Sequence, residues 1–125
     1  MEMKTILIKH AVFALALVAG TAPALAVCQV QPIWTADNQT VPGSMTATSN
    51  SWCSVSMGIG IAGVSDAAIL AKPKNGEIVL KGFRVFYRSK KGFTGTDNFT
   101  YSRIQNDRWG NKAKRTVDMT VTAVP

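Results

Sequence analysis

The residue types that most often carry catalysis are scarce in this chain of 125 residues. Its only histidine, His10, lies in an N-terminal segment with the features of a signal peptide. Removal of that segment leaves no histidine for a Ser or Cys triad or for a His-containing zinc site. Two cysteines alone cannot complete a tetrahedral zinc site. The six acids of the remaining chain show no paired spacing: Asp37, Asp66, Glu77, Asp97, Asp107 and Asp118. We therefore expect no enzyme, no catalytic residue, no cofactor and no metal.

One glycine motif could suggest a nucleotide site. Residues 58–63 read Gly-Ile-Gly-Ile-Ala-Gly, a literal G-x-G-x-x-G. A dinucleotide fold needs a helix directly after this motif and an acidic residue about 20 positions further on. Pro73 leaves no room for a full helix, and that acid is missing. We expect a flexible strand or a bulge here instead.

The first 26 residues predict export. Lys4 and Lys9 precede an unbroken apolar run over 11–19, and Ala24-Leu25-Ala26 fits a small-x-small cleavage pattern. The run is too short to span a bilayer. The sequence thus predicts a signal peptide at 1–26 and one domain at 27–125, in the periplasm or outside the cell, with no transmembrane segment.

The two cysteines, Cys28 and Cys53, allow two kinds of processing. Residues 25–28 approach the pattern at which bacterial lipoproteins are cut and lipidated, but depart from it at Val27. A lipid on Cys28 would also leave Cys53 unpaired, so we favour plain cleavage over a lipid anchor. In an exported chain the two cysteines then predict a Cys28–Cys53 disulfide, with two buried free thiols as the alternative.

The remaining chain has the pattern of short strands separated by turns. We expect strands at 27–34, 45–57, 68–71, 77–80, 83–88, 99–101 and 117–123, and a polar connection at 35–43. In the last strand Val117, Met119 and Val121 should face the core, and the intervening threonines should face solvent. About seven such strands predict an all-β sandwich, with a small barrel as the alternative.

The second half carries a more specific pattern. Pro73-Lys74-Asn75-Gly76 is followed by Phe86-Tyr87, by Gly-Phe-Thr-Gly-Thr-Asp-Asn-Phe-Thr-Tyr at 92–101, and by Asp107, Gly110 and Asn111 before a Thr/Val strand. Residues 73–124 resemble the bacterial Ig-like, cadherin-like repeat of large secreted adhesins. The resemblance implies an Ig-like sandwich. This chain departs from such adhesins because it has one copy and is basic, so calcium binding is not carried over.

Each residue of that pattern has a structural role. Gly92 and Gly95 permit a tight turn beside Phe93. Asp97 can accept hydrogen bonds from nearby backbone amides and fix the turn. Phe99 and Tyr101 should fill the core, and the Tyr101 hydroxyl could bond a backbone group as a tyrosine corner does.

Positive charge gathers in the second half. Of the fourteen Lys and Arg residues, all except Lys4 and Lys9 lie between Lys72 and Arg115. We expect a basic face built from Arg84, Arg88, Lys90, Lys91 and Arg103. Phe86 would be its exposed apolar neighbour. Such a face suits an acidic polysaccharide or envelope protein rather than nucleic acid, although a solvated face that only keeps the domain soluble is the alternative.

The tryptophans add one candidate contact. Trp52, beside Cys53, should pack in the core. Trp109, in a turn, either is exposed to a partner or folds back over the end of the sandwich. Together these features predict a non-enzymatic exported module that binds a partner or serves a structural role. The main alternative is a small periplasmic inhibitor or accessory protein that acts on an enzyme or envelope complex.

Overall fold

The computed structural model describes residues 25–57 and 64–125. The Gly58–Gly63 motif and most of the predicted signal peptide lie outside the described residues. The described chain forms strands and connections, without a helix. Its strands are β1 (Cys28–Val30), β2 (Thr40–Thr48), β3 (Cys53–Ser56), β4 (Ser65–Ala71), β5 (Gly76–Lys81), β6 (Arg84–Ser89), β7 (Gly95–Asn106) and β8 (Lys112–Val124).

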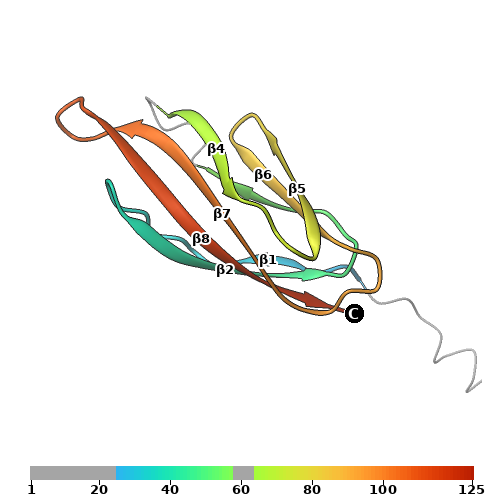
Figure 1. The fold of residues 1–125 in the computed structure, drawn as a ribbon. Helices are drawn as coiled ribbons and strands as arrows, with labels where there is room; N and C mark the ends of the chain where they lie inside the picture. Colours follow the sequence, from blue (N-terminus) through green and yellow to red (C-terminus); the bar gives the residue numbers. More distant parts are fainter. Residues whose placement is uncertain (1–24, 58–63) are drawn as a thin grey trace, which may run out of the picture.

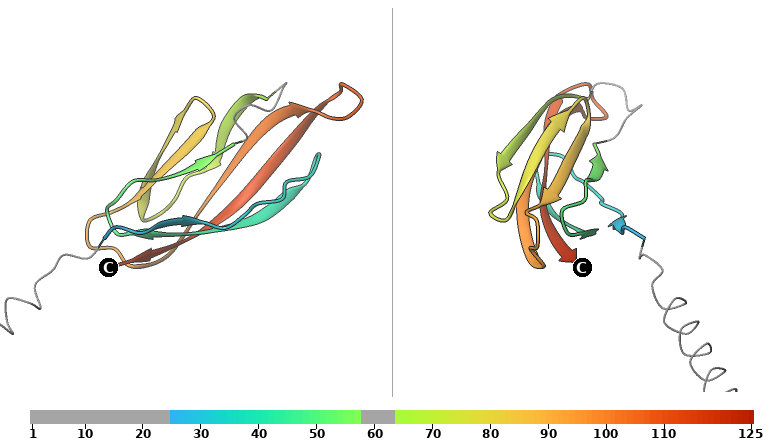
Figure 2. Two further views of the ribbon diagram at one scale, coloured as in Figure 1. Left: turned by 180° about the vertical axis from the view of Figure 1, so that it is seen from behind. Right: turned by 90° about the vertical axis from the view of Figure 1, so that its right-hand side faces the viewer.

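These strands form two sheets, so the all-β sandwich is confirmed over the barrel alternative. The large sheet has the order β1-β2-β8-β7-β4, and the small sheet has the order β3-β6-β5. Figures 1 and 2 show the small sheet lying against one face of the large sheet. Strands β2 and β8 pair in parallel, and every other pairing is antiparallel.

The core lies between the two sheets and follows the period of two residues along each strand. In β8, Val117, Met119 and Val121 are buried while Thr120 and Thr122 are exposed, as the sequence predicted. Aromatic rings fill the centre, where the rings of Tyr87 and Phe99 stack with centroids 5.7 Å apart. Large and branched side chains from both sheets thus supply the apolar burial that holds the layers together.

The predicted Cys28–Cys53 disulfide is present and leaves no free cysteine. It joins β1 of the large sheet to β3 of the small sheet and closes a sequence separation of 25 residues. The bond therefore fastens the N-terminal edge of the large sheet to the small sheet.

The prediction of one strand over 45–57 is wrong, because the chain changes sheets inside it. Strand β2 ends at Thr48 and β3 begins at Cys53. Between them Asn50 adopts a left-handed backbone, with φ of 58°. Its backbone N–H donates to Ser89 Oγ at 2.9 Å, and its side-chain amide donates to the Ser89 carbonyl at 3.2 Å. The turn is thus fixed by a partner 39 residues away, which local alternation does not reveal.

The predicted connection over 35–43 is also too long, since β2 begins at Thr40. Pro42 and Gly43, at the end of that predicted connection, lie in the strand instead. At these positions β2 pairs only with β8, because β1 is paired with Met45 to Ala47 further along. No strand therefore pairs with the other edge of β2 at Pro42. A missing N–H on that edge breaks no hydrogen bond between strands, and proline is tolerated there. The first strand was predicted over 27–34, but in the structure it is shorter and ends at Val30.

Strands β7 and β8 form the longest hairpin, with 12 and 13 residues. Its tip projects beyond the other strands at the upper left of Figure 1. The long hairpin extends the inner surface of the large sheet towards that end, and the polar residues described below lie on this extension.

Candidate functional site

The first candidate is the outer surface of the small sheet, called here the basic face and formed by Trp52, Ser54, Glu77, Val79, Lys81, Arg84, Phe86 and Arg88. In β6 the partly exposed Arg84, Phe86 and Arg88 alternate with buried Val85 and Tyr87. This is the alternation that the sequence predicted.

Strand register sets the neighbours on this face. Phe86 lies opposite Val79 on β5, and Arg84 lies opposite Lys81. Trp52, Val79, Lys81 and Phe86 together line a shallow pocket of about 310 Å³. An apolar centre therefore lies next to cationic side chains.

Two of the cations on the basic face are held in place by neighbours. The Arg88 guanidinium lies 4.5 Å from the centre of the Trp52 ring, and Arg88 Nε donates to Glu77 Oε1 at 2.7 Å. Arg84 Nη2 donates to Ser54 Oγ at 2.8 Å. The expectation that Trp52 packs in the core is wrong, because 43% of it is exposed on this face. Its indole instead forms a cation–π contact.

The other predicted basic residues lie elsewhere. Lys90 and Lys91 are exposed in the connection after β6, where the Lys90 N–H donates to the Asn75 carbonyl at 2.8 Å. Arg103 lies on β7 of the large sheet and is only 8% exposed. Arg103 therefore does not belong to the basic face. Its positive charge alone suggested the basic face, whereas the alternation that buries Phe99 and Tyr101, continued along β7, turns residue 103 inward.

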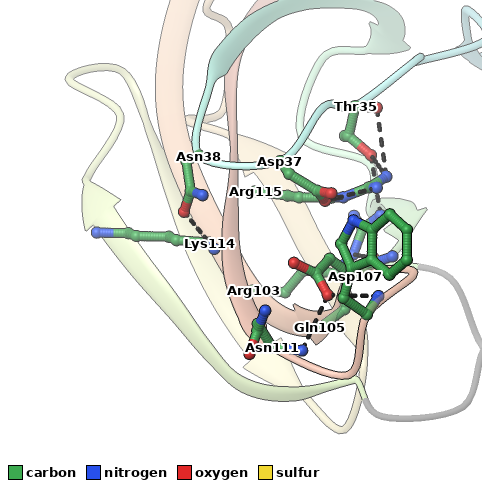
Figure 3. A network of polar contacts seen from close by, with 10 residues as sticks. Thr35, Asp37, Asn38, Arg103, Gln105, Asp107, Asn111, Lys114 and Arg115 are labelled. Carbon is green, nitrogen blue, oxygen red and sulfur yellow. Dashed lines mark hydrogen bonds and ion pairs between the residues drawn. The ribbon is translucent and has the colours of Figure 1, made fainter.

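A second candidate surrounds Arg103 on the inner surface of the large sheet (Figure 3). Arg103 lies directly opposite Arg115 in the β7–β8 pairing. Arg103 Nη2 and Arg115 Nη1 both donate to Thr35 Oγ1, at 3.1 and 3.0 Å. Arg103 Nε donates to Gln105 Oε1 at 3.0 Å. Arg115 also pairs with Asp37, at 2.7 Å from Nη2 to Oδ1.

Residues Ile33, Trp34, Thr35, Ser56, Tyr101, Arg103 and Arg115 line a pocket of about 410 Å³, called here the inner pocket. Burial lowers the pKa of Arg103, and the nearby charge of Arg115 lowers it further. Burial raises the pKa of Tyr101 to about 12, although the charge of Arg103 opposes that rise. The inner pocket is thus lined by cations and by a neutral phenol, a set rich in hydrogen-bond donors.

Sequence reasoning missed Thr35 and Arg115 as members of this pocket, and Asp37 as the ion-pair partner of Arg115. One signal was available for Arg115. In a hairpin, residues equally far from the centre of the turn lie opposite each other, and 103 and 115 are equally far from Trp109 in the predicted turn. Nothing local pointed to Thr35 and Asp37. The segment that holds them is joined to β8 through Asn38, whose N–H donates to the Lys114 carbonyl at 2.8 Å.

A third feature is the tip of the β7–β8 hairpin. Asp107 Oδ1 accepts hydrogen bonds from the backbone N–H groups of Trp109 and Asn111, at 2.8 and 2.9 Å. Trp109 is 78% exposed, which decides between the two placements that the sequence left open. The Arg108 guanidinium lies 5.6 Å from its ring centre. A fixed turn thus presents an aromatic ring beside a cation.

The residues that carried the family resemblance are mostly structural. Gly92 and Gly95 have positive φ values of 81° and 128°, as a tight turn requires. Phe93, partly buried, follows Gly92, and Phe99 and Tyr101 are buried in the core. No hydrogen bond from the Tyr101 hydroxyl to a backbone group is found in the described part of the chain.

Asp97 does accept backbone hydrogen bonds, as predicted, but it fixes a more distant turn. Its Oδ1 accepts from the N–H groups of Lys74, at 3.1 Å, and of its neighbour Asn98, at 2.9 Å. Its Oδ2 accepts from the Asn75 N–H at 3.2 Å. The carboxylate thus joins two parts of the pattern that lie more than 20 residues apart.

Within residues 25–57 and 64–125 no group of three His, Cys, Asp or Glu side chains could hold a metal ion. The same residues include no helix long and apolar enough to cross a membrane. Comparison of the chain with protein-family models, with curated proteins and with solved structures gives no match.

Proposed function

We propose that this chain is an exported, non-enzymatic binding module with an Ig-like fold that engages an anionic glycan through its basic face. The observation that carries the proposal is the pocket between Phe86, Val79 and Trp52, with Lys81 in its wall. Aromatic rings can lie flat on sugar rings, and neighbouring cations attract the acidic groups of the polymer.

The strand order supports the Ig-like part of the proposal. In Ig-like sandwiches strands B, E and D share one sheet and strands C, F and G share the other. Here β3, β6 and β5 are adjacent in the small sheet, and β4, β7 and β8 are adjacent in the large sheet. In antibody domains the disulfide joins strands B and F, which correspond here to β3 and β7. Here the disulfide joins β3 to β1 instead, so its position differs.

The disulfide also supports export. Disulfide bonds persist in oxidising compartments and are rare in the cytosol. The bond occupies the Cys28 sulfur, the atom to which a lipid would be attached, so it favours the unlipidated protein.

Binding to polygalacturonate tests the proposal, with neutral dextran as the polymer control. We expect retention on polygalacturonate that falls steeply as salt rises, because exposed charges are screened within about 8 Å at physiological ionic strength. Phe86→Ala and Arg84→Gln should each weaken retention, whereas Lys112→Gln, on the other sheet, should not. Binding that is absent, insensitive to salt or equal on dextran contradicts the proposal.

The hairpin tip favours a second candidate function, that of an inhibitor or accessory protein for an envelope enzyme or complex. A fixed turn that presents an exposed Trp109 resembles the aromatic anchors at the centres of protein interfaces. Under this function a single stoichiometric partner from envelope extract should bind the wild type and the Phe86→Ala variant but not Trp109→Ala. Retention by polygalacturonate, unaffected by Trp109→Ala, favours the glycan function.

A further inference from the structure

We propose that the inner pocket is a second, separate binding site, which takes the carboxylate of one acidic sugar residue such as a uronic acid. The pocket lies on the inner surface of the large sheet, whereas the basic face is the outer surface of the small sheet. The inference therefore stands whether or not the basic face binds a polymer.

Arg103 supplies the first argument. More than nine-tenths of it is buried, and its hydrogen-bond partners among the described residues, Gln105 and Thr35, are neutral. The ion pairs in the described part of the chain are Arg88–Glu77 and Arg115–Asp37, so neither includes Arg103. Residues 58–63 contain no acidic side chain. A buried charge is costly unless it is paired, so an anionic group from outside the chain would stabilise Arg103.

Thr35 supplies the second argument. Its hydroxyl oxygen accepts a hydrogen bond from each of the two guanidinium groups, Arg103 and Arg115. A hydroxyl has two acceptor lone pairs and one donor hydrogen. With both lone pairs in use, the Thr35 O–H is left to donate. Arg103 Nη1 has no acceptor among the described residues, and so the pocket offers donors from both groups to an oxygen-rich ligand.

The charges of the pocket indicate a monoanion. Arg103 and Arg115 each carry one positive charge, and Asp37 cancels one of them through its contact with Arg115. Tyr101 stays neutral, because burial raises its pKa to about 12. One net positive charge matches a carboxylate better than a phosphate dianion, and a guanidinium presents parallel N–H groups to both carboxylate oxygens.

The rest of the lining indicates a sugar. Trp34 belongs to the pocket wall yet is 87% exposed, so its ring is open to a ligand that enters from solvent. Indole rings stack against the C–H faces of pyranoses, and Ser56 adds a hydroxyl for polar contacts. The volume of about 410 Å³ lies at the small end of the range of about 300–1,000 Å³ that is typical of small-molecule sites.

Titration of the full-length protein with galacturonic acid, followed by the indole N–H signals in ¹H–¹⁵N NMR spectra, tests the proposal. Trp34→Ala assigns the Trp34 signal, which should shift with galacturonic acid but not with galactose. Arg103→Gln should weaken binding at least about tenfold, since it removes one partner of a buried charge pair. Lys112→Gln, which removes an exposed cation of β8 outside the pocket, is the control and should bind as the wild type does.

Four outcomes would overturn the proposal. The first is the absence of any shift at Trp34. The second is an equal response to galactose or sulfate, which contradicts recognition of a carboxylate. The third is an equal response to acetate, which contradicts recognition of a sugar. The fourth is unchanged affinity in Arg103→Gln. If Arg103→Gln does not fold, Trp34→Ala still decides, because its exposed side chain can be removed without a cavity. This variant has no Trp34 signal, so its affinity for galacturonic acid is measured by calorimetry and should be lost.

Discussion

The Tyr87 hydroxyl donates a hydrogen bond to Asp97 Oδ2 at 2.8 Å and thereby joins the small sheet to the large sheet. Tyr87 lies on β6, and Asp97 lies on β7. Asp97 is 5% exposed and also accepts from the backbone N–H groups of Lys74 and Asn75. One carboxylate therefore holds together both layers and the connection between β4 and β5.

Replacement of Asp97 should destabilise the fold strongly. Asp97→Ala removes the acceptor for three groups outside its own strand and leaves the buried Tyr87 hydroxyl without a partner. We expect the free energy of unfolding to fall by about 3 kcal/mol. Tyr87→Phe should cost about 1 kcal/mol, because it removes one hydrogen bond and leaves the carboxylate with its backbone donors. Urea unfolding measures both values, and an Asp97→Ala effect no larger than that of Tyr87→Phe would show that the backbone contacts contribute little.

Stability should decline at alkaline pH. Burial raises the pKa of Tyr101 to about 12 in the folded protein, from about 10 in the unfolded chain. Burial, helped by the hydrogen bond to Asp97 and its charge, raises the pKa of Tyr87 as well. The unfolded chain thus releases these protons at lower pH than the folded protein. The stabilisation is complete below pH 10 and is lost as pH rises from about 10 towards 12.

Unfolding free energies measured from pH 9 to pH 12 check this decline. Tyr101→Phe should give a shallower slope, since one of the linked protons is gone. A slope equal to that of the wild type would mean that Tyr101 ionises alike in the folded and unfolded states.

Loss of the disulfide should lower stability through the unfolded state. A bond that closes a separation of 25 residues lowers the conformational entropy of the unfolded chain. In the loop-entropy model this stabilises the folded protein by about 3 kcal/mol. Cys28→Ser with Cys53→Ser should therefore lower the melting temperature, and a reducing agent should affect the wild type alone. If the double variant has the same melting temperature as the oxidised wild type, the bond does not stabilise the fold.

Gly76 should tolerate no side chain. A Cβ atom there would lie 2.6 Å from the Arg88 carbonyl oxygen and 2.8 Å from the Tyr87 ring. We expect Gly76→Ala to cost about 2 kcal/mol through overpacking. Gly82 is the control, because it has φ of 60° and no atom lies within 4 Å of the position that a Cβ would occupy. Gly82→Ala should therefore cost only about 1 kcal/mol, from backbone strain. Equal effects on urea unfolding would show that the backbone around Gly76 moves aside.

Several elements could be predicted because their signals are local. The alternation over 117–123 specified which side chains of β8 are buried, and the same period in 83–88 placed Arg84 and Phe86 on one outward face. The break between β2 and β3 escaped prediction, because Asn50 turns the chain through hydrogen bonds to Ser89. Trp52 escaped it too, since a cation–π contact with Arg88 holds it on the surface.

By itself, the sequence determined the all-β class, the disulfide partners and the faces of the regular strands. These depend on residue type and on the fixed period of two, which act within a few residues. Only the tertiary structure decided that Arg103, which the period of two already turns inward, meets Arg115 and Thr35 in the inner pocket. Such meetings depend on strand pairing and on the packing of segments about 70 residues apart, and no local pattern records them.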